Sequence, residues 1–237
     1  GVQLSLLEVE MKVSVIGAGS WGTALAHVLG LGGNDVMLWA RKQEVCDGVN
    51  ERHENPRYLI GCTIDSHVKA STSFEEVLSD TCAVVVVTPS AVIRQTCANI
   101  APYINDDTPI VVCCKGVEEG SGLVPVEVLE AELGNANRLA ALAGPNHAEE
   151  VILGIPAGTV IASQSEQTAR FFQELFATDA FRTYISEDVI GVEVCAAAKN
   201  VVAIACGLSY GMGYGDNTAS LLMTRGLAEM SRLVAAC

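Results

Sequence analysis

A glycine-rich turn between two apolar segments is the part of this sequence best suited to chemistry. Gly17, Gly19 and Gly22 follow the β-branched run 13–16 in a G-x-G-x-x-G spacing and open an Ala/Leu-rich segment. Gly17 would allow a tight turn, Gly19 would let the backbone approach a pyrophosphate, and Gly22 would let a helix pack closely on the sheet. Free N–H groups at a helix start favour an anion. A turn without a ligand can have the same glycines, but the strand–turn–helix order favours a dinucleotide-binding site.

Two lysines could act on a substrate beside this turn. Lys199 lies in an apolar, Ala-rich run, where a lysine must reach a cavity, a carboxylate or solvent. A desolvated lysine has a lowered pKa and can act as a general base, whereas an ion-paired or snorkelling lysine has no such role. Lys115 follows an apolar run and precedes Gly116. It is either an ordinary solvated charge or a cation that holds an anionic or hydroxyl-bearing substrate.

Arg41 bears on the choice between two dinucleotides. It follows the second apolar run, where NAD-specific sites often have an acidic residue for the ribose 2′-hydroxyl, and none stands here. An arginine at this point can instead face a 2′-phosphate. We therefore expect NADP or NAD as cofactor, with a mild preference for NADPH.

Alternating strand and helix patterns position these residues. Strands are expected at 13–16, 36–39, 68–70, 83–87, 110–113, 139–143, 159–162 and 182–185, and helices at 21–31, 42–52, 74–79, from 148, at 189–207 and from 216 or 217 to the end. Ser73 and Glu76 have capping-box spacing, and Asp216 or Asn217 is expected to cap the last helix. Repeated βα units predict an α/β fold: a doubly wound, mostly parallel Rossmann sheet followed by a truncated all-helical domain. The expected divisions are an amino-terminal arm or added residues at 1–10, a dinucleotide-binding domain at 11–186 and a helical substrate domain at 187–237.

Composition limits the partners. The chain has 237 residues, 28 acidic and 14 basic, and a formal net charge of −14, which argues against nucleic acid and an anionic membrane surface. Nine cysteines and four histidines show no zinc-ligand spacing, so we expect reduced, buried thiols, no metal and a cytoplasmic location. No stretch is expected to cross a bilayer. Because half of the residues are hydrophobic, apolar surface could remain for a homodimer.

Several motifs together resemble the NAD(P)-dependent glycerol-3-phosphate dehydrogenase family, from about residue 11 to the end. They are GAGSWGTALA at 17–26, KG at 115–116, AGPNHAEEV at 143–151, KNVVAIA at 199–205, GDNTA at 215–219 and TRGLAEM at 224–230. The resemblance implies that the chain, or the protein of which it is the amino-terminal part, interconverts glycerone phosphate and sn-glycerol 3-phosphate with NAD(P)H, for phospholipid synthesis.

The resemblance also implies roles for individual residues. Ser20, Trp21, Arg41 and Ala148 would contact the dinucleotide together with the glycines, and Lys115 would touch both cofactor and small-molecule substrate. Gly144 and Asn146 would line the substrate site, and Lys199 would accept the proton. Asn146 stands where the family often has Ser or Thr, which keeps a hydrogen-bonding side chain.

One departure concerns the phosphate of the substrate. The family has a further acidic residue and an Arg-Asn pair that grips this phosphate, downstream of the region matching 229–233. We therefore expect the 237-residue chain to be a fragment that binds cofactor but turns over substrate weakly. A β-hydroxyacid-type dehydrogenase and a non-catalytic dinucleotide-binding module are the alternatives.

Overall fold

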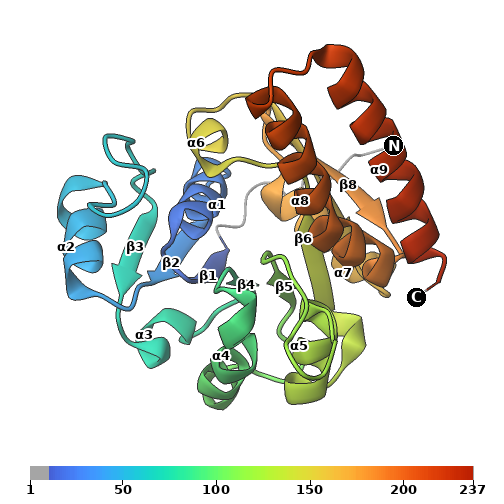
Figure 1. Cartoon of the computed structure of the whole chain (residues 1–237). Helices are drawn as coiled ribbons and strands as arrows, with labels where there is room; N and C mark the ends of the chain where they lie inside the picture. The colour runs from blue at the N-terminus through green and yellow to red at the C-terminus, as the bar shows by residue number, and fades with distance from the viewer. Residues whose placement is uncertain (1–10, 237) are drawn as a thin grey trace, which may run out of the picture.

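A single eight-stranded sheet forms the centre of the computed structural model, which describes residues 11–236 (Figure 1). The arm expected at 1–10 lies outside the described residues. The strands run in the order β3-β2-β1-β4-β5-β6-β7-β8, and only β6 and β7 pair antiparallel within this sheet. The strands are β1 (Lys12–Ile16), β2 (Asp35–Trp39), β3 (Val68–Ser71), β4 (Ala83–Val86), β5 (Ile110–Val112), β6 (Leu139–Ala143), β7 (Ala157–Ala162) and β8 (Phe181–Ser186). The first six strands have the order of a Rossmann sheet.

Helices cover both faces of this sheet. They are α1 (Ser20–Leu31), α2 (Gln43–Arg52), α3 (Phe74–Leu78), α4 (Ile93–Ile100), α5 (Pro125–Leu133), α6 (Ala148–Val151), α7 (Glu166–Phe176), α8 (Val189–Gly211) and α9 (Asp216–Val234), with short 3-10 turns η1 (Ser90–Val92), η2 (Ala101–Tyr103) and η3 (Ala136–Arg138). Buried side chains of α1, α2, α6 and α7 share one core, and those of α3, α4 and α5 share another on the opposite face. The doubly wound α/β class is therefore confirmed.

The alternation of side chains along β1 shows how the sequence builds these two layers. Val13 and Val15 enter the first core, whereas Ile16 enters the second. Ser14 also points to the second face, where its hydroxyl donates to the carbonyl oxygen of Val77 at 2.6 Å. Successive residues of a strand point to opposite faces, so Ser14 lies on the same face as Ile16. Because this face is buried, the Ser14 hydroxyl needs a hydrogen-bond acceptor, which the carbonyl of Val77 supplies.

The last two helices lie side by side at one end of the sheet (Figure 1). The first turns of α8 pack on the sheet through Val189 and Ala196, which are buried. The expected cap of the last helix is wrong: Gly215 is the N-cap of α9, and Asp216 is its first helical residue. Asp216 instead accepts a hydrogen bond from the Tyr210 hydroxyl at 2.9 Å.

Two further expectations need correction. By length and composition alone, α8 could cross a membrane, so the expectation that no stretch would qualify is wrong; a core helix of a soluble protein passes the same test. The capping box at Ser73 is only half formed. The Ser73 hydroxyl accepts from the N–H of Glu76, but the Glu76 carboxylate binds the Ser71 hydroxyl instead of the Ser73 N–H.

Candidate functional site

The glycine turn has the shape that its spacing predicts. Gly17 adopts a φ of +122°, in the range that L side chains rarely adopt, and a Cβ there would lie 3.0 Å from the carbonyl oxygen of Val87. A Cβ on Gly22 would lie 1.7 Å from the carbonyl oxygen of Gly17, so only glycine fits there. At Gly19 a Cβ would meet no atom within 4 Å. The backbone at Gly19 therefore faces open space, where a ligand could approach it closely.

This open space belongs to a cleft of about 920 Å³ at the carboxyl ends of β1, β2, β4 and β5. The order of the strands reverses between β1 and β4, which is where open α/β sheets bind ligands. The cleft is lined by the residues predicted for the dinucleotide: Gly17, Gly19, Ser20, Trp21, Gly22, Arg41, Lys115 and Ala148. Asn146 lines it as well. Its size and its position over the start of α1 fit a dinucleotide.

Two ammonium groups meet at one carbonyl beside this cleft. The Nζ of Lys199, on α8, donates to the carbonyl oxygen of Gly144 at 3.1 Å. The Nζ of Lys115, after β5, donates to the same oxygen at 3.2 Å. Gly144 and Lys199 do not line the cleft themselves but are joined to it through Lys115. The fold therefore brings together two lysines that are far apart in the sequence.

The electrostatics of the pair favour a neutral amine. Partial burial, together with the charge and hydrogen bond of Lys199, lowers the pKa of Lys115 to about 8. Two ammonium groups that share one acceptor repel each other, so loss of one proton relieves the repulsion. Near neutral to mildly basic pH, this pair can therefore take up or release a proton.

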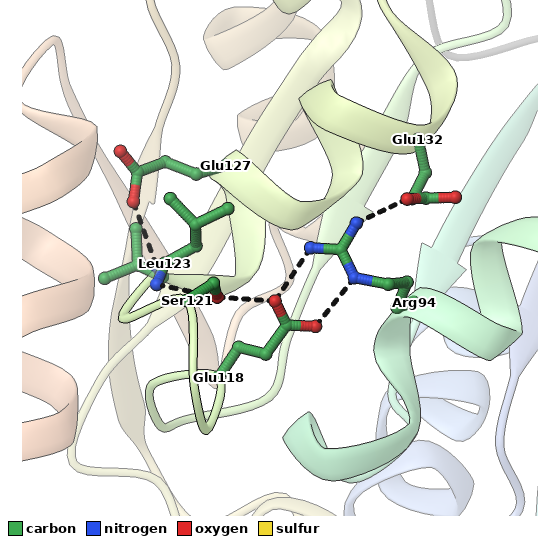
Figure 2. Close-up of polar contacts among 7 residues, drawn as sticks. Arg94, Glu118, Ser121, Leu123, Glu127 and Glu132 are labelled. Carbon is green, nitrogen blue, oxygen red and sulfur yellow. Dashed lines mark hydrogen bonds and ion pairs between the residues drawn. The ribbon is translucent and has the colours of Figure 1, made fainter.

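Hydrogen bonds and ion pairs hold the loop that follows Lys115 (Figure 2). Arg94, on α4, donates to both carboxylate oxygens of Glu118, at 2.9 and 2.7 Å, and also pairs with Glu132 on α5. Glu118 in turn accepts from the Ser121 hydroxyl at 2.6 Å. Hydrogen bonding by Arg94 lowers the pKa of Glu118 to about 2. The loop is thereby tied to α4, whose residues Gln95, Thr96 and Asn99 line the cleft.

A buried asparagine, which the sequence analysis missed, joins two walls of the cleft. Asn55 is 1% exposed, and its Nδ2 donates to the carbonyl oxygen of Ala18 at 3.1 Å and the hydroxyl of Thr23 at 2.8 Å. Its Oδ1 accepts from the backbone N–H groups of Arg57 and Tyr58, at 3.0 and 3.2 Å. Arg57 and Tyr58 also line the cleft. The Asn-Pro sequence at 55–56 indicates a turn, but no local signal shows that it reaches the glycine loop.

Asn146, two residues after Gly144, and Glu193, six residues before Lys199, each have a buried side-chain oxygen. Asn146 donates from Nδ2 to the carbonyl oxygen of Gly158 at 2.9 Å, and its Oδ1 is buried without a described partner. Glu193, two turns before Lys199 on α8, accepts from the backbone N–H of Val126 at 3.0 Å. Burial raises the pKa of Glu193 to about 8. Glu193 thus attaches α8 to the start of α5.

The sheet order, the glycine turn and the cleft define a Rossmann-fold protein with a site for a dinucleotide. Residues 12–169 match the family described as NAD-dependent glycerol-3-phosphate dehydrogenase N-terminus, and residues 188–237 match the corresponding C-terminus. The chain belongs to this family.

Similar proteins agree with this assignment. Glycerol-3-phosphate dehydrogenase [NAD(P)+] from Shouchella clausii is 44% identical over 225 residues, which are 94% of this chain and 66% of the relative. A crystal structure of glycerol-3-phosphate dehydrogenase from Coxiella burnetii has a TM-score of 0.88 at 35% identity and covers 96% of this chain and 69% of that one. The structure of the enzyme from Saccharomyces cerevisiae has a TM-score of 0.83 at 27% identity, with 95% and 70% covered. The chain spans about 66% of the length of the curated relative it matches.

Proposed function

We propose that this chain is part of an oxidoreductase that interconverts glycerone phosphate and sn-glycerol 3-phosphate with NAD(P)H, for phospholipid synthesis. The observation that carries the proposal is the convergence of Lys115 and Lys199 on the carbonyl oxygen of Gly144, beside a dinucleotide-sized cleft. Membership of the glycerol-3-phosphate dehydrogenase family supports this substrate over a β-hydroxyacid.

The glycine loop and the residues around it would hold the cofactor. Backbone N–H groups at the start of α1, from Ser20 and Trp21 onward, bind the pyrophosphate, while Arg41 and Ala148 contact other parts of the dinucleotide. The open space at Gly19 supports this fit, since a Cβ there would occupy the ligand's place. When bound, the nicotinamide accepts or supplies the hydride.

The two lysines would orient the substrate and move its proton. Lys115 contacts both cofactor and substrate, and Gly144 and Asn146 line the substrate site. Lys199 accepts the hydroxyl proton at Nζ when the secondary alcohol is oxidised. Above about pH 8, the lowered pKa of Lys115 leaves one amine of the hydrogen-bonded pair neutral, and a neutral amine in this pair can take up the substrate proton. Alcohol oxidation should therefore accelerate as the pH rises through 8.

Cofactor binding and turnover, measured separately, test the proposal. We expect calorimetry to detect NADPH or NADH binding to the parent chain, and absorbance to report glycerone phosphate reduction, even if slow. Lys199→Met should lower turnover at least about 100-fold with little change in cofactor affinity. Lys69→Met, a change of an exposed lysine on β3, is the matched control and should leave both unchanged.

The outcomes separate the alternatives. Cofactor binding without turnover of glycerone phosphate would favour a non-catalytic dinucleotide-binding module. Faster turnover of a 2-keto or 3-keto acid than of glycerone phosphate would favour the β-hydroxyacid class. Full activity of Lys199→Met would contradict the assigned proton acceptor.

The division into units and the assembly are part of the same proposal. We propose a dinucleotide-binding domain at 11–186 and helical substrate-domain residues at 187–237, in a cytoplasmic protein. The exposed apolar side chains of Val201, Leu208 and Leu221 support a homodimer through α8 and α9. Light scattering on the parent and on Leu208→Ser tests this, since a monomeric parent would contradict it.

A further inference from the structure

Positive charge gathers where the cleft passes the end of β2. Arg41 and Lys42 follow this strand directly, and Arg57 reaches the same part of the cleft from the loop after α2. Among the described residues that line the cleft, none is acidic, although the chain contains 28 Asp and Glu residues and has a net charge of −14. The cleft is thus locally cationic in an acidic protein, which favours an anionic ligand group at this end.

The end of β2 has a known place in the Rossmann fold. The adenosine ribose of a dinucleotide lies there, and an acidic residue typically binds its 2′-hydroxyl in NAD sites, whereas an arginine accommodates the 2′-phosphate of NADP. Here Arg41 stands at the strand end, and no acid does. Arg57 adds a second guanidinium.

The structure fixes the backbone of Arg57 and leaves its side chain partly exposed. Asn55 accepts from the Arg57 N–H and at the same time donates to the glycine loop at Ala18. The Arg57 side chain is 43% exposed, and its Nη1 lies 2.7 Å from Oε1 of Glu44, in the first turn of α2. Lys42 Nζ lies 3.9 Å from the same oxygen. Glu44 is therefore the counter-ion of the Arg57 guanidinium, which lines the cleft.

We propose that Arg57 is a specificity-determining residue that, with Arg41, binds the 2′-phosphate of an NADP-type dinucleotide, and that Glu44 is its counter-ion when that phosphate is absent. This inference rests on the proposed dinucleotide binding. A phosphate offers a guanidinium the same paired oxygens as a carboxylate, with more charge. Binding of NADPH then exchanges one ion pair for another, whereas binding of NADH leaves the Arg57–Glu44 pair intact. Glu44 thereby moderates the preference for NADPH.

The alternative is that Arg57 and Glu44 form an ordinary surface ion pair, which contributes little to stability and has no part in ligand binding. The chain offers a matched example in Arg170 and Glu166 on α7, which are 2.7 Å apart, are both exposed and do not line the cleft. Substitution of that pair controls for general effects of changed surface charge on a charged ligand.

The experiment measures the dissociation constants of NADPH and NADH by calorimetry, with adenosine 2′-monophosphate as a fragment probe. We expect Arg57→Gln to weaken NADPH and the fragment about tenfold and to change NADH less than about twofold. Glu44→Gln should tighten NADPH about threefold and leave NADH unchanged. In the double variant the gain from Glu44→Gln should shrink to the part that acts through Lys42, because the shorter ion pair of Glu44 is with Arg57. Arg170→Gln should change neither cofactor.

The inference and the proposed function fail in different ways. If Arg57→Gln weakens both cofactors equally, or neither, the 2′-phosphate assignment is wrong while dinucleotide binding stands. If Glu44→Gln tightens NADPH equally with and without Arg57, the counter-ion role is wrong. If the parent binds neither cofactor although its thermal unfolding shows a folded protein, the proposed function itself fails. Equal melting temperatures of all variants will show that the differences do not come from folding.

Discussion

Apolar side chains are buried in the helices that cover the sheet but are largely exposed on α8 and α9. In α1, Leu25 and Leu29 are completely buried between the helix and the sheet. In α8 and α9, Leu208 and Leu227 are both 62% exposed, and Ala219 is the one described residue of α9 that is buried. The helices α1 and α8, which are similarly apolar, therefore differ in what they contribute: α1 stabilises a core, whereas the outer faces of α8 and of its neighbour α9 contribute little burial among the described residues.

Lys199 lies on α8 between its buried first turns and its exposed later turns. The turns before it, with Glu193 and Ala196, are buried against the sheet layer, and the turns after it carry exposed side chains such as Val201. The position of Lys199 therefore depends on the first part of α8, which Glu193 attaches to the N–H of Val126, and on the hydrogen bond from Lys199 to Gly144.

The largest expected difference between the two regions is in stability. Leu29→Ala, in α1, should lower the free energy of unfolding by about 2–5 kcal/mol, because it removes buried methyl groups and leaves a cavity. Leu208→Ala, in α8, should change the unfolding free energy of the monomer by less than about 0.5 kcal/mol, since this side chain is 62% exposed in the single chain. Urea unfolding of both variants measures this, and similar losses would contradict the comparison.

The attachment of α8 should depend on pH through Glu193. Its pKa is raised from 4.5 to about 8 by burial, so the folded state binds the proton more tightly than the unfolded state does. Stability should therefore fall as the pH rises from about 5 to 8, by roughly 3 kcal/mol. Glu193→Gln cannot titrate and should have a flatter profile over this range. Parallel profiles of unfolding free energy for parent and variant would show that Glu193 ionises normally.

Within the proposed nucleotide-binding region, substitutions of Gly19 and Gly22 should distinguish an effect on cofactor affinity from an effect on stability. Gly19→Val places its side chain in open space, so we expect cofactor affinity to fall about 100-fold with an unchanged melting temperature. Gly22→Val forces a side chain against the carbonyl oxygen of Gly17, so both binding and stability should suffer. Calorimetry and thermal unfolding of the two variants measure this. An unchanged cofactor affinity of Gly19→Val would contradict the assignment of the dinucleotide site to the glycine loop.

The smallest expected effect concerns the choice between cofactors. Arg41→Asp should convert a mild preference for NADPH into a preference for NADH, with each affinity changing by about tenfold or less. The reason is that a carboxylate repels a 2′-phosphate and accepts from a 2′-hydroxyl. Equal affinities of both cofactors in the parent and in the variant, measured by calorimetry, would contradict this expectation.

Much of the fold could be predicted because its signals are local. The runs before Gly17 and at β2, β4 and β6 are apolar and short, as buried strands are, and the structure has strands there. The helices α4, α5 and α7 were not predicted, although two of them have a local start signal: Pro125 at the first turn of α5, and the Ser165 hydroxyl accepting from the N–H of Thr168 at the start of α7. The cap of α9 was misplaced by one or two residues, because Gly215, Asp216 and Asn217 are all good capping residues.

Glycine spacing predicts the part of the candidate site that one segment forms, whereas Arg41, Lys115 and Ala148 were named from strand ends or from the family resemblance and also line the cleft. Gly17, Gly19 and Gly22 were identified from their spacing, and the cleft lies over them. Asn55 and Arg57 were missed because their contacts, to the glycine loop and to Glu44, join segments far apart in the chain. Nothing in the local sequence distinguishes them from ordinary residues of a polar loop.

The sequence by itself determined the strand–turn–helix around the glycines, because backbone freedom and hydrophobic period are properties of neighbouring residues. Only the tertiary structure decided that Lys115 and Lys199 meet at Gly144, which is 29 residues from one and 55 from the other. The lowered pKa of Lys115 also follows from that meeting, since desolvation and repulsion by a second ammonium group arise only when the folded chain brings two like charges together out of water.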